Sequence, residues 1–148
     1  MTLIYAFLFS FTASYFFAVI YDAPKKLFFA AGLAGASGYL ISFILNDLLQ
    51  IDSIYSSLLG SLTLGVMSRI LKSPVVIFMI PGIIPLVPGS LAYKAMQQLV
   101  TLNFTEANNT FIRTILIAGS IALGLLLSDQ LSKTLNIKKY WKVKRNRL

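Results

Sequence analysis

The clearest chemical signature in this sequence is a group of prolines and glycines inside an apolar segment: Pro81, Gly82, Pro85, Pro88 and Gly89. Each proline lacks a backbone N–H group and prevents the carbonyl four residues earlier from accepting a helical hydrogen bond. Because an unpaired backbone group in hydrocarbon costs several kcal/mol, a continuous lipid-facing helix is unfavourable here. We therefore expect a discontinuous helix of the kind that forms substrate sites in transporters. A kink that serves only helix packing is the alternative.

The residues that follow could bind a small polar ligand. Pro88, Gly89 and Ser90 have the composition of a helix start, whose free N–H groups and positive dipole end suit a carboxylate. Lys94 could meet a substrate carboxylate or an acid of a partner, or extend to the membrane surface. Tyr93 could bond a ligand or serve packing. We take these residues and the Pro/Gly segment as the candidate substrate site.

The composition indicates that this site lies in a membrane protein. Of the 148 residues, 57% are hydrophobic and only 12% are charged, about half the charged share of a soluble domain. A bilayer core needs about 20 apolar residues for each helix. We expect an all-α integral membrane bundle at residues 1–131 with about five transmembrane helices, the fourth broken by Pro and Gly, and a basic tail at 132–148. The expected spans are 3–21, 27–45, 54–71, 75–102 and 110–131, with polar connections at 46–53 and 103–109.

The charged residues predict the orientation, because positive loops stay in the cytoplasm. If 75–102 crosses once, one side carries Lys25, Lys26, Arg69, Lys72 and the tail, and the other carries Asp47, Asp52 and Glu106. This places the N-terminus outside and the C-terminus in the cytoplasm. Arg113, near the outer end of the last span, is an exception that requires snorkelling or a partner. We interpret Asp22 and Asp129 as solvated boundary charges.

Other functional classes find little support in the residue types. The net charge of +8 could suggest nucleic acid, but seven of the thirteen basic residues lie between Lys133 and Arg147, directly after an apolar run. Such a cluster is typical of a cytoplasmic helix end beside anionic lipid. The sequence has no cysteine and no histidine, and it shows neither a metal-ligand cluster nor an enzyme motif. We expect no enzyme activity, no cofactor, no metal and no nucleic-acid partner.

Small residues at four-residue spacing predict close helix packing. They lie within the bundle or face a partner subunit, and the spacing does not distinguish these cases. The pairs and runs are Ala31/Gly35, Ala34/Gly38, Ser57/Ser61/Gly65, Ala118/Ala122 and Ser120/Gly124.

The Pro/Gly segment carries a family resemblance. Arg69, the run Lys72-Ser-Pro74, the double motif from Pro81 to Gly89, and then Tyr93 and Met96 resemble the signature of the threonine/serine exporter family (ThrE-like). The resemblance is to its C-terminal half, which also exists as a separate small membrane subunit of the YjjB-like type. It implies a larger membrane subunit bearing the other half of the exporter.

The resemblance implies export of threonine and serine through the bacterial cell membrane or, in some split members, export of a dicarboxylate such as succinate. We therefore expect the small subunit of a split secondary exporter. A non-transporting membrane scaffold or assembly subunit and a small homo-oligomeric channel are the alternatives from other classes.

Overall fold

The fold of the chain is all helical in the residues that the structure, a computed structural model, describes: 2–70 and 75–145. The bounds follow in chain order, with η1 and η3 as 3-10 turns and η2 as a π-helical turn. They are α1 (Thr2–Ile20), η1 (Lys25–Leu27), α2 (Phe28–Phe43), η2 (Ile44–Leu48), α3 (Ser53–Ile70), α4 (Val75–Ile83), η3 (Ile84–Leu86), α5 (Gly89–Val100) and α6 (Phe104–Arg145).

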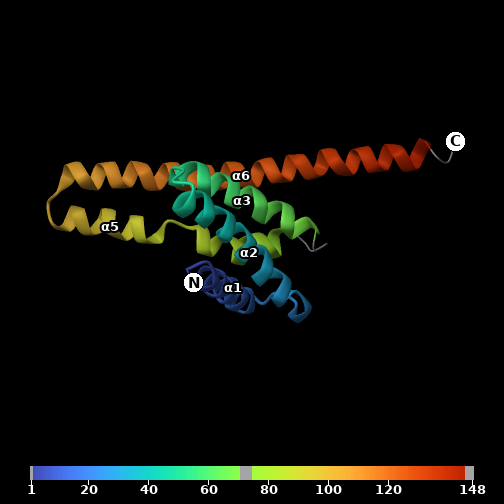
Figure 1. The fold of residues 1–148 in the computed structure, drawn as a ribbon, viewed down its shortest axis with the longest axis horizontal. Coiled ribbons are helices and arrows are strands. Elements are labelled where there is room, and N and C mark those ends of the chain that lie inside the picture. Colours follow the sequence, from blue (N-terminus) through green and yellow to red (C-terminus); the bar gives the residue numbers. More distant parts are fainter. Residues whose placement is uncertain (1, 71–74, 146–148) are drawn as a thin grey trace.

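The helices are arranged around α6, which runs along the long axis of the molecule (Figure 1). The α1–α4 bundle gathers beside the middle of α6, and α3 makes the most extensive contact with it. The α5 helix packs against the first part of α6, the helix that follows it in the chain. The two form a hairpin that extends beyond the ends of α2 and α3 (Figure 1). The segment that contains the candidate site, from Pro81 to Lys94, therefore begins at the centre of the bundle and ends in this hairpin.

Three of the described helical segments are long and apolar enough to cross a membrane: Thr2–Ile20, Lys25–Leu48 and Phe104–Leu131. They correspond to the first, second and last expected spans. The fourth expected span is divided between α4, with 9 residues, and α5, with 12 residues. Each is too short to cross a hydrocarbon core alone, because about 20 residues are required.

The last helix differs from the expectation at both ends. It begins at Phe104, inside the stretch expected to be a polar turn, and continues to Arg145 through the basic tail. Asn103 followed by Glu106 has the spacing of a capping box, and an acidic residue in the first turn favours a helix N-terminus. From Phe104 to Arg145 there is no proline, so nothing in the sequence forces the helix to end earlier.

The small residues pack the bundle internally. A methyl group added at Gly35 would overlap the Ser14 hydroxyl, and one added at Gly65 would overlap the hydroxyl of Ser128. These faces thus bring α2 against α1 and α3 against α6, and they are not open to another chain. Ala118 and Ala122, by contrast, are exposed on α6.

Candidate functional site

The Pro/Gly segment forms an irregular connection between α4 and α5. Pro81 lies inside α4, Pro85 lies in η3, and the backbone becomes extended at Val87. The amide of Val87 donates to the carbonyls of Ile83 at 3.2 Å and Ile84 at 3.3 Å, and the Gly89 amide donates to the Val87 carbonyl at 2.8 Å. The turn is therefore stabilised by its own short-range hydrogen bonds.

The first Pro-Gly pair lies in the centre of the bundle. Pro81 is fully buried, and a methyl group built on Gly82 would lie 3.6 Å from the Cα atom of Gly35. Ser14 of α1 packs against the same Gly35, so α1, α2 and α4 meet at this point. The Ser14 hydroxyl is buried and has no hydrogen-bond partner among the described residues. A buried unpaired hydroxyl is unfavourable, but the packing around Gly35 leaves no space for a ligand unless these helices separate.

The second Pro-Gly pair and the residues after it face outward. Gly89 and Ser90 are exposed, and no atom lies within 4 Å of a methyl group built on Gly89. Tyr93 is 72% exposed, and Lys94 is exposed without an ion pair to any described residue. The residues expected to form one site therefore divide between the bundle centre, at Pro81 and Gly82, and an open helix, from Gly89 onward.

The open helix, α5, has three distinct sides. Leu91, Ala95 and Gln98 form its inner stripe against α6, where the Gln98 amide donates to Glu106 Oε2 at 3.2 Å. At 100° per residue the remaining side chains separate into an apolar side and a polar side. The apolar side carries Ala92, Tyr93, Met96, Leu99 and Val100, and the polar side carries Ser90, Lys94, Gln97 and Thr101. Tyr93 and Lys94 therefore lie on different sides of α5.

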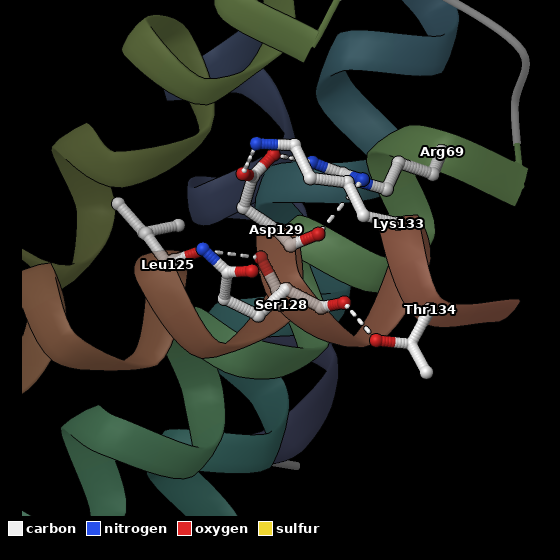
Figure 2. Close-up of polar contacts among 7 residues, drawn as sticks. Arg69, Leu125, Ser128, Asp129, Lys133 and Thr134 are labelled. Carbon is white, nitrogen blue, oxygen red and sulfur yellow. Dashed lines mark hydrogen bonds and ion pairs between the residues drawn. The ribbon is translucent and has the colours of Figure 1, made fainter. Parts of the chain in front are cut away.

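An ion cluster that the sequence analysis missed joins α3 to α6. Arg69 donates to the Asp129 carboxylate and, at 3.5 Å, to the Asp129 backbone carbonyl. Lys133 Nζ lies 2.6 Å from the second oxygen of the same carboxylate (Figure 2). Arg69 is 19% and Asp129 is 33% exposed, so Asp129 is a paired group and not the solvated boundary charge that we expected. Both residues stand near the end of an apolar segment, which is the signal that could have suggested the pair.

The basic residues gather at one end of the bundle. Leu27 and Phe28, which follow Lys25 and Lys26, pack on the same core cluster as Met67, close in sequence to Arg69. The end with Arg69 and Lys133 thus also carries the two exposed lysines. Lys72 lies outside the described residues.

The opposite end of the bundle carries Asp47 and Asp52. Asp52 caps the start of α3 by accepting from the Ile54 amide at 2.9 Å, and its other carboxylate oxygen lies 3.6 Å from Arg113. Of the two explanations expected for Arg113, snorkelling or a partner, the structure thus provides a partner.

A protein-family model matches most of the chain. The family model for the threonine/serine exporter, ThrE, matches residues 6–131. The chain belongs to the threonine/serine exporter family. The match includes α1 to α5 and the apolar part of α6, so it covers both halves of the divided segment. The members of this family are transporters. The long apolar helices of this chain are typical of a membrane protein.

One relative is longer than the region that this chain matches. It is a protein of Haemophilus influenzae, described only as uncharacterized, and is 26% identical over 140 residues. The match covers 86% of this chain but 46% of the relative. The chain thus spans about half the length of the curated relative it matches. No solved structure matches the chain.

Proposed function

We propose that this chain is one subunit of a split secondary exporter that moves threonine and serine out of the cell, with a larger membrane subunit supplying the other half. The observation that carries the proposal is that an exporter family matches nearly the whole chain, while the chain spans only 46% of a relative. Transporters commonly place the substrate between two repeats. A chain with a single divided helix is expected to supply one of the two parts.

The proposed topology has five crossings, with the N-terminus outside and the C-terminus in the cytoplasm. In this arrangement α4, η3 and α5 together make the fourth crossing. The packing supports one continuous direction, since Gly82 lies against Leu64 in the middle of α3, and Leu91 reaches the cluster of Ile117 and Ile121 on α6. The basic end, at Arg69 and Lys133, would face the cytoplasm.

The proposed substrate region is the connection from Pro81 to Gly89. Pro81 leaves a backbone carbonyl without its helical donor, and the buried Ser14 hydroxyl lies beside the same crossing. At the other end of the connection, the first turn of α5 begins at Gly89 with no side-chain cap. Carbonyl and hydroxyl oxygens suit an ammonium group, and free N–H groups suit a carboxylate. An amino acid carries both groups, so each end of the connection would contact it in turn along the transport path.

A gene deletion in the organism of origin tests this function. Cells loaded with threonine-containing dipeptides should retain more intracellular threonine and serine when the gene is deleted, and the wild-type gene should restore efflux. Intracellular succinate, measured in the same samples, serves as the control for the dicarboxylate alternative. Unchanged threonine and serine would refute the proposal, and a selective rise in succinate would favour the dicarboxylate exporter.

A further inference from the structure

A polar pocket lies away from the Pro/Gly segment, where α2 and α3 diverge. Its volume is about 180 Å³, which is room for one small solute or a few waters. The lining residues are Tyr39, Ser42, Phe43, Asn46, Ser53 and Ser57. This is the end of the bundle that carries Asp47 and Asp52, opposite the Arg69 cluster.

The pocket exists because α2 and α3 meet closely and then separate. A methyl group built on Gly60 would lie 2.7 Å from the Gly38 carbonyl and 2.9 Å from a Leu86 methyl, so the contact leaves no space there. One turn further, α2 passes into the π-helical turn η2, in which the Leu49 amide donates to the Ile44 carbonyl at 3.2 Å. Such turns are frequent at functional sites. Leu86 also connects the base of this region to the proline-containing turn η3.

Two serine hydroxyls in the pocket differ from the other serines of their helices. Ser56 and Ser61, also buried on α3, bond backbone carbonyls of their own segment. Ser57 is 6% exposed and makes no hydrogen bond with a described residue, and the same is true of the half-buried Ser42. Both line the pocket. They therefore present donors and acceptors that a ligand can use.

The amide of Asn46, which lines the pocket together with the hydroxyls of Tyr39 and Ser53, is held in one orientation. The Asn46 amide nitrogen donates to the Ile51 carbonyl at 3.2 Å and to Ser53 Oγ at 2.9 Å. Its carbonyl oxygen remains as an acceptor. None of the lining residues is charged, so the wall offers no full charge to compensate a dianion. Hydroxyls and an amide oxygen match a ligand group that both donates and accepts, as an alcohol does.

We propose that this pocket binds the side-chain hydroxyl of a small hydroxylated amino acid as it leaves the exporter, with Ser57 and Ser42 as its hydrogen-bonding residues. The inference rests on the proposed function and adds a selectivity site on the α2–α3 pair. It disfavours a dicarboxylate at this position.

The chain has no cysteine, so Ser57→Cys introduces a unique and nearly isosteric thiol. The rate of modification by a methanethiosulfonate reagent is measured on the purified full-length variant in mild detergent. Threonine at ten times its Kd should slow this rate about tenfold by mass action, and succinate should not. Ser56→Cys, one residue away and fully buried, should stay unreactive, whereas Asp47→Cys, which is exposed, should react at the same rate with or without threonine.

Threonine efflux from cells is measured in parallel, so that a failure of the pocket assignment can be distinguished from a failure of the export function. If threonine leaves the modification rate of Ser57→Cys unchanged while the wild-type protein exports threonine, the pocket assignment alone is overturned. Equal protection by succinate would overturn the ligand class. Protection by threonine without any efflux from wild-type cells would contradict the export function and leave the pocket in place.

Discussion

Gly35 lies where three helices meet, with the Ser14 hydroxyl and Gly82 directly against it. Gly35→Ala should lower the free energy of unfolding of the protein in detergent by about 1–3 kcal/mol, because an added methyl group overpacks a site without free space. Thermal unfolding followed by circular dichroism measures the loss. Gly119→Ala is the matched control, since nothing lies within 4 Å of the new methyl group and alanine favours a helix. Equal stability of the two variants would show that the crossing is looser than described.

The Arg69–Asp129 pair permits a second test at this scale. Asp129→Asn should destabilise the protein by about 1.5–3 kcal/mol, because hydrogen bonds to charged groups have that range and Arg69 is left partly buried without its partner. Arg69→Gln combined with Asp129→Asn should cost less than the sum of the single changes, as is expected for residues in contact. Asp22→Asn, at an exposed position, is the control. Additive effects in the double variant would mean that the pair does not couple α3 to α6.

The sequence predicted the contacts of some residues but not of others. Arg113 was foreseen either to snorkel or to pair, because it lies near the end of a membrane helix, and Asp52 pairs with it. The Arg69–Asp129 pair was not foreseen, because the two residues lie 60 positions apart and nothing in the sequence gives the relative rotation of α3 and α6. The pocket serines were missed for the same reason, since Ser56 and Ser57 look alike until the helices are packed.

At the scale of elements, the connection between α4 and α5 carries the proposed substrate region. Gly89→Leu should abolish export, because a bulky side chain would block the approach of a ligand to the backbone. The amount of protein in the membrane should not change, because no atom of a described residue lies near a side chain added at Gly89. Gly89→Ala should retain most of the activity. Efflux of threonine from cells and membrane abundance by immunoblot are measured together. Normal export by Gly89→Leu would show that neither a ligand nor a partner approaches this glycine.

The three prolines of the same connection give an independent test. Replacing Pro81, Pro85 and Pro88 together with alanine should reduce efflux, because it removes the residues that keep α4 and α5 from forming one continuous helix. A decrease in the accessibility of cysteines placed at 87 and 90 would confirm the structural change. Full transport by the triple variant would show that the segment is a kink that serves only helix packing.

The elements themselves were largely predictable where composition decides them. The helices α1, α2 and α3 lie within a few residues of the expected ranges, because their apolar runs end at charged or polar residues. However, α3 is not among the described segments that are long and apolar enough to cross a membrane. The start of α6 was misplaced since the polar stretch from Asn103 was interpreted as a turn, although its capping pattern favours a helix. That the α5–α6 hairpin would extend beyond α2 and α3 could not be predicted, because it depends on where α6 packs along the bundle.

For the whole molecule, the two ends of the bundle differ in net charge. One end carries Lys25, Lys26, Arg69 and Lys133 with Asp22 and Asp129, and the other carries Asp47 and Asp52 with Arg113. The basic end should face the cytoplasm. A reporter that is active only in the cytoplasm should therefore be active when fused after Leu148 and inactive when fused before Met1. The reverse pattern, or activity at both positions, would refute the five-crossing topology.

The small-residue faces at Gly35 and Gly65 are filled by this chain's own helices, so the proposed partner must bind elsewhere. Ala118 and Ala122 remain exposed on α6, at a spacing that permits close helix contact. Ala118→Leu with Ala122→Leu should therefore weaken copurification with the larger subunit in mild detergent, without loss of stability. Unchanged copurification would place the partner on another face.

If one chain of this sequence is half of an exporter, threonine efflux from liposomes should require the other half as well. Liposomes loaded with labelled threonine are reconstituted with this chain alone, with the larger subunit alone, or with both. We predict efflux at the background rate of protein-free liposomes for each single chain, and efflux clearly above background only when both are present. Robust efflux from liposomes that contain this chain alone would contradict the split-exporter account.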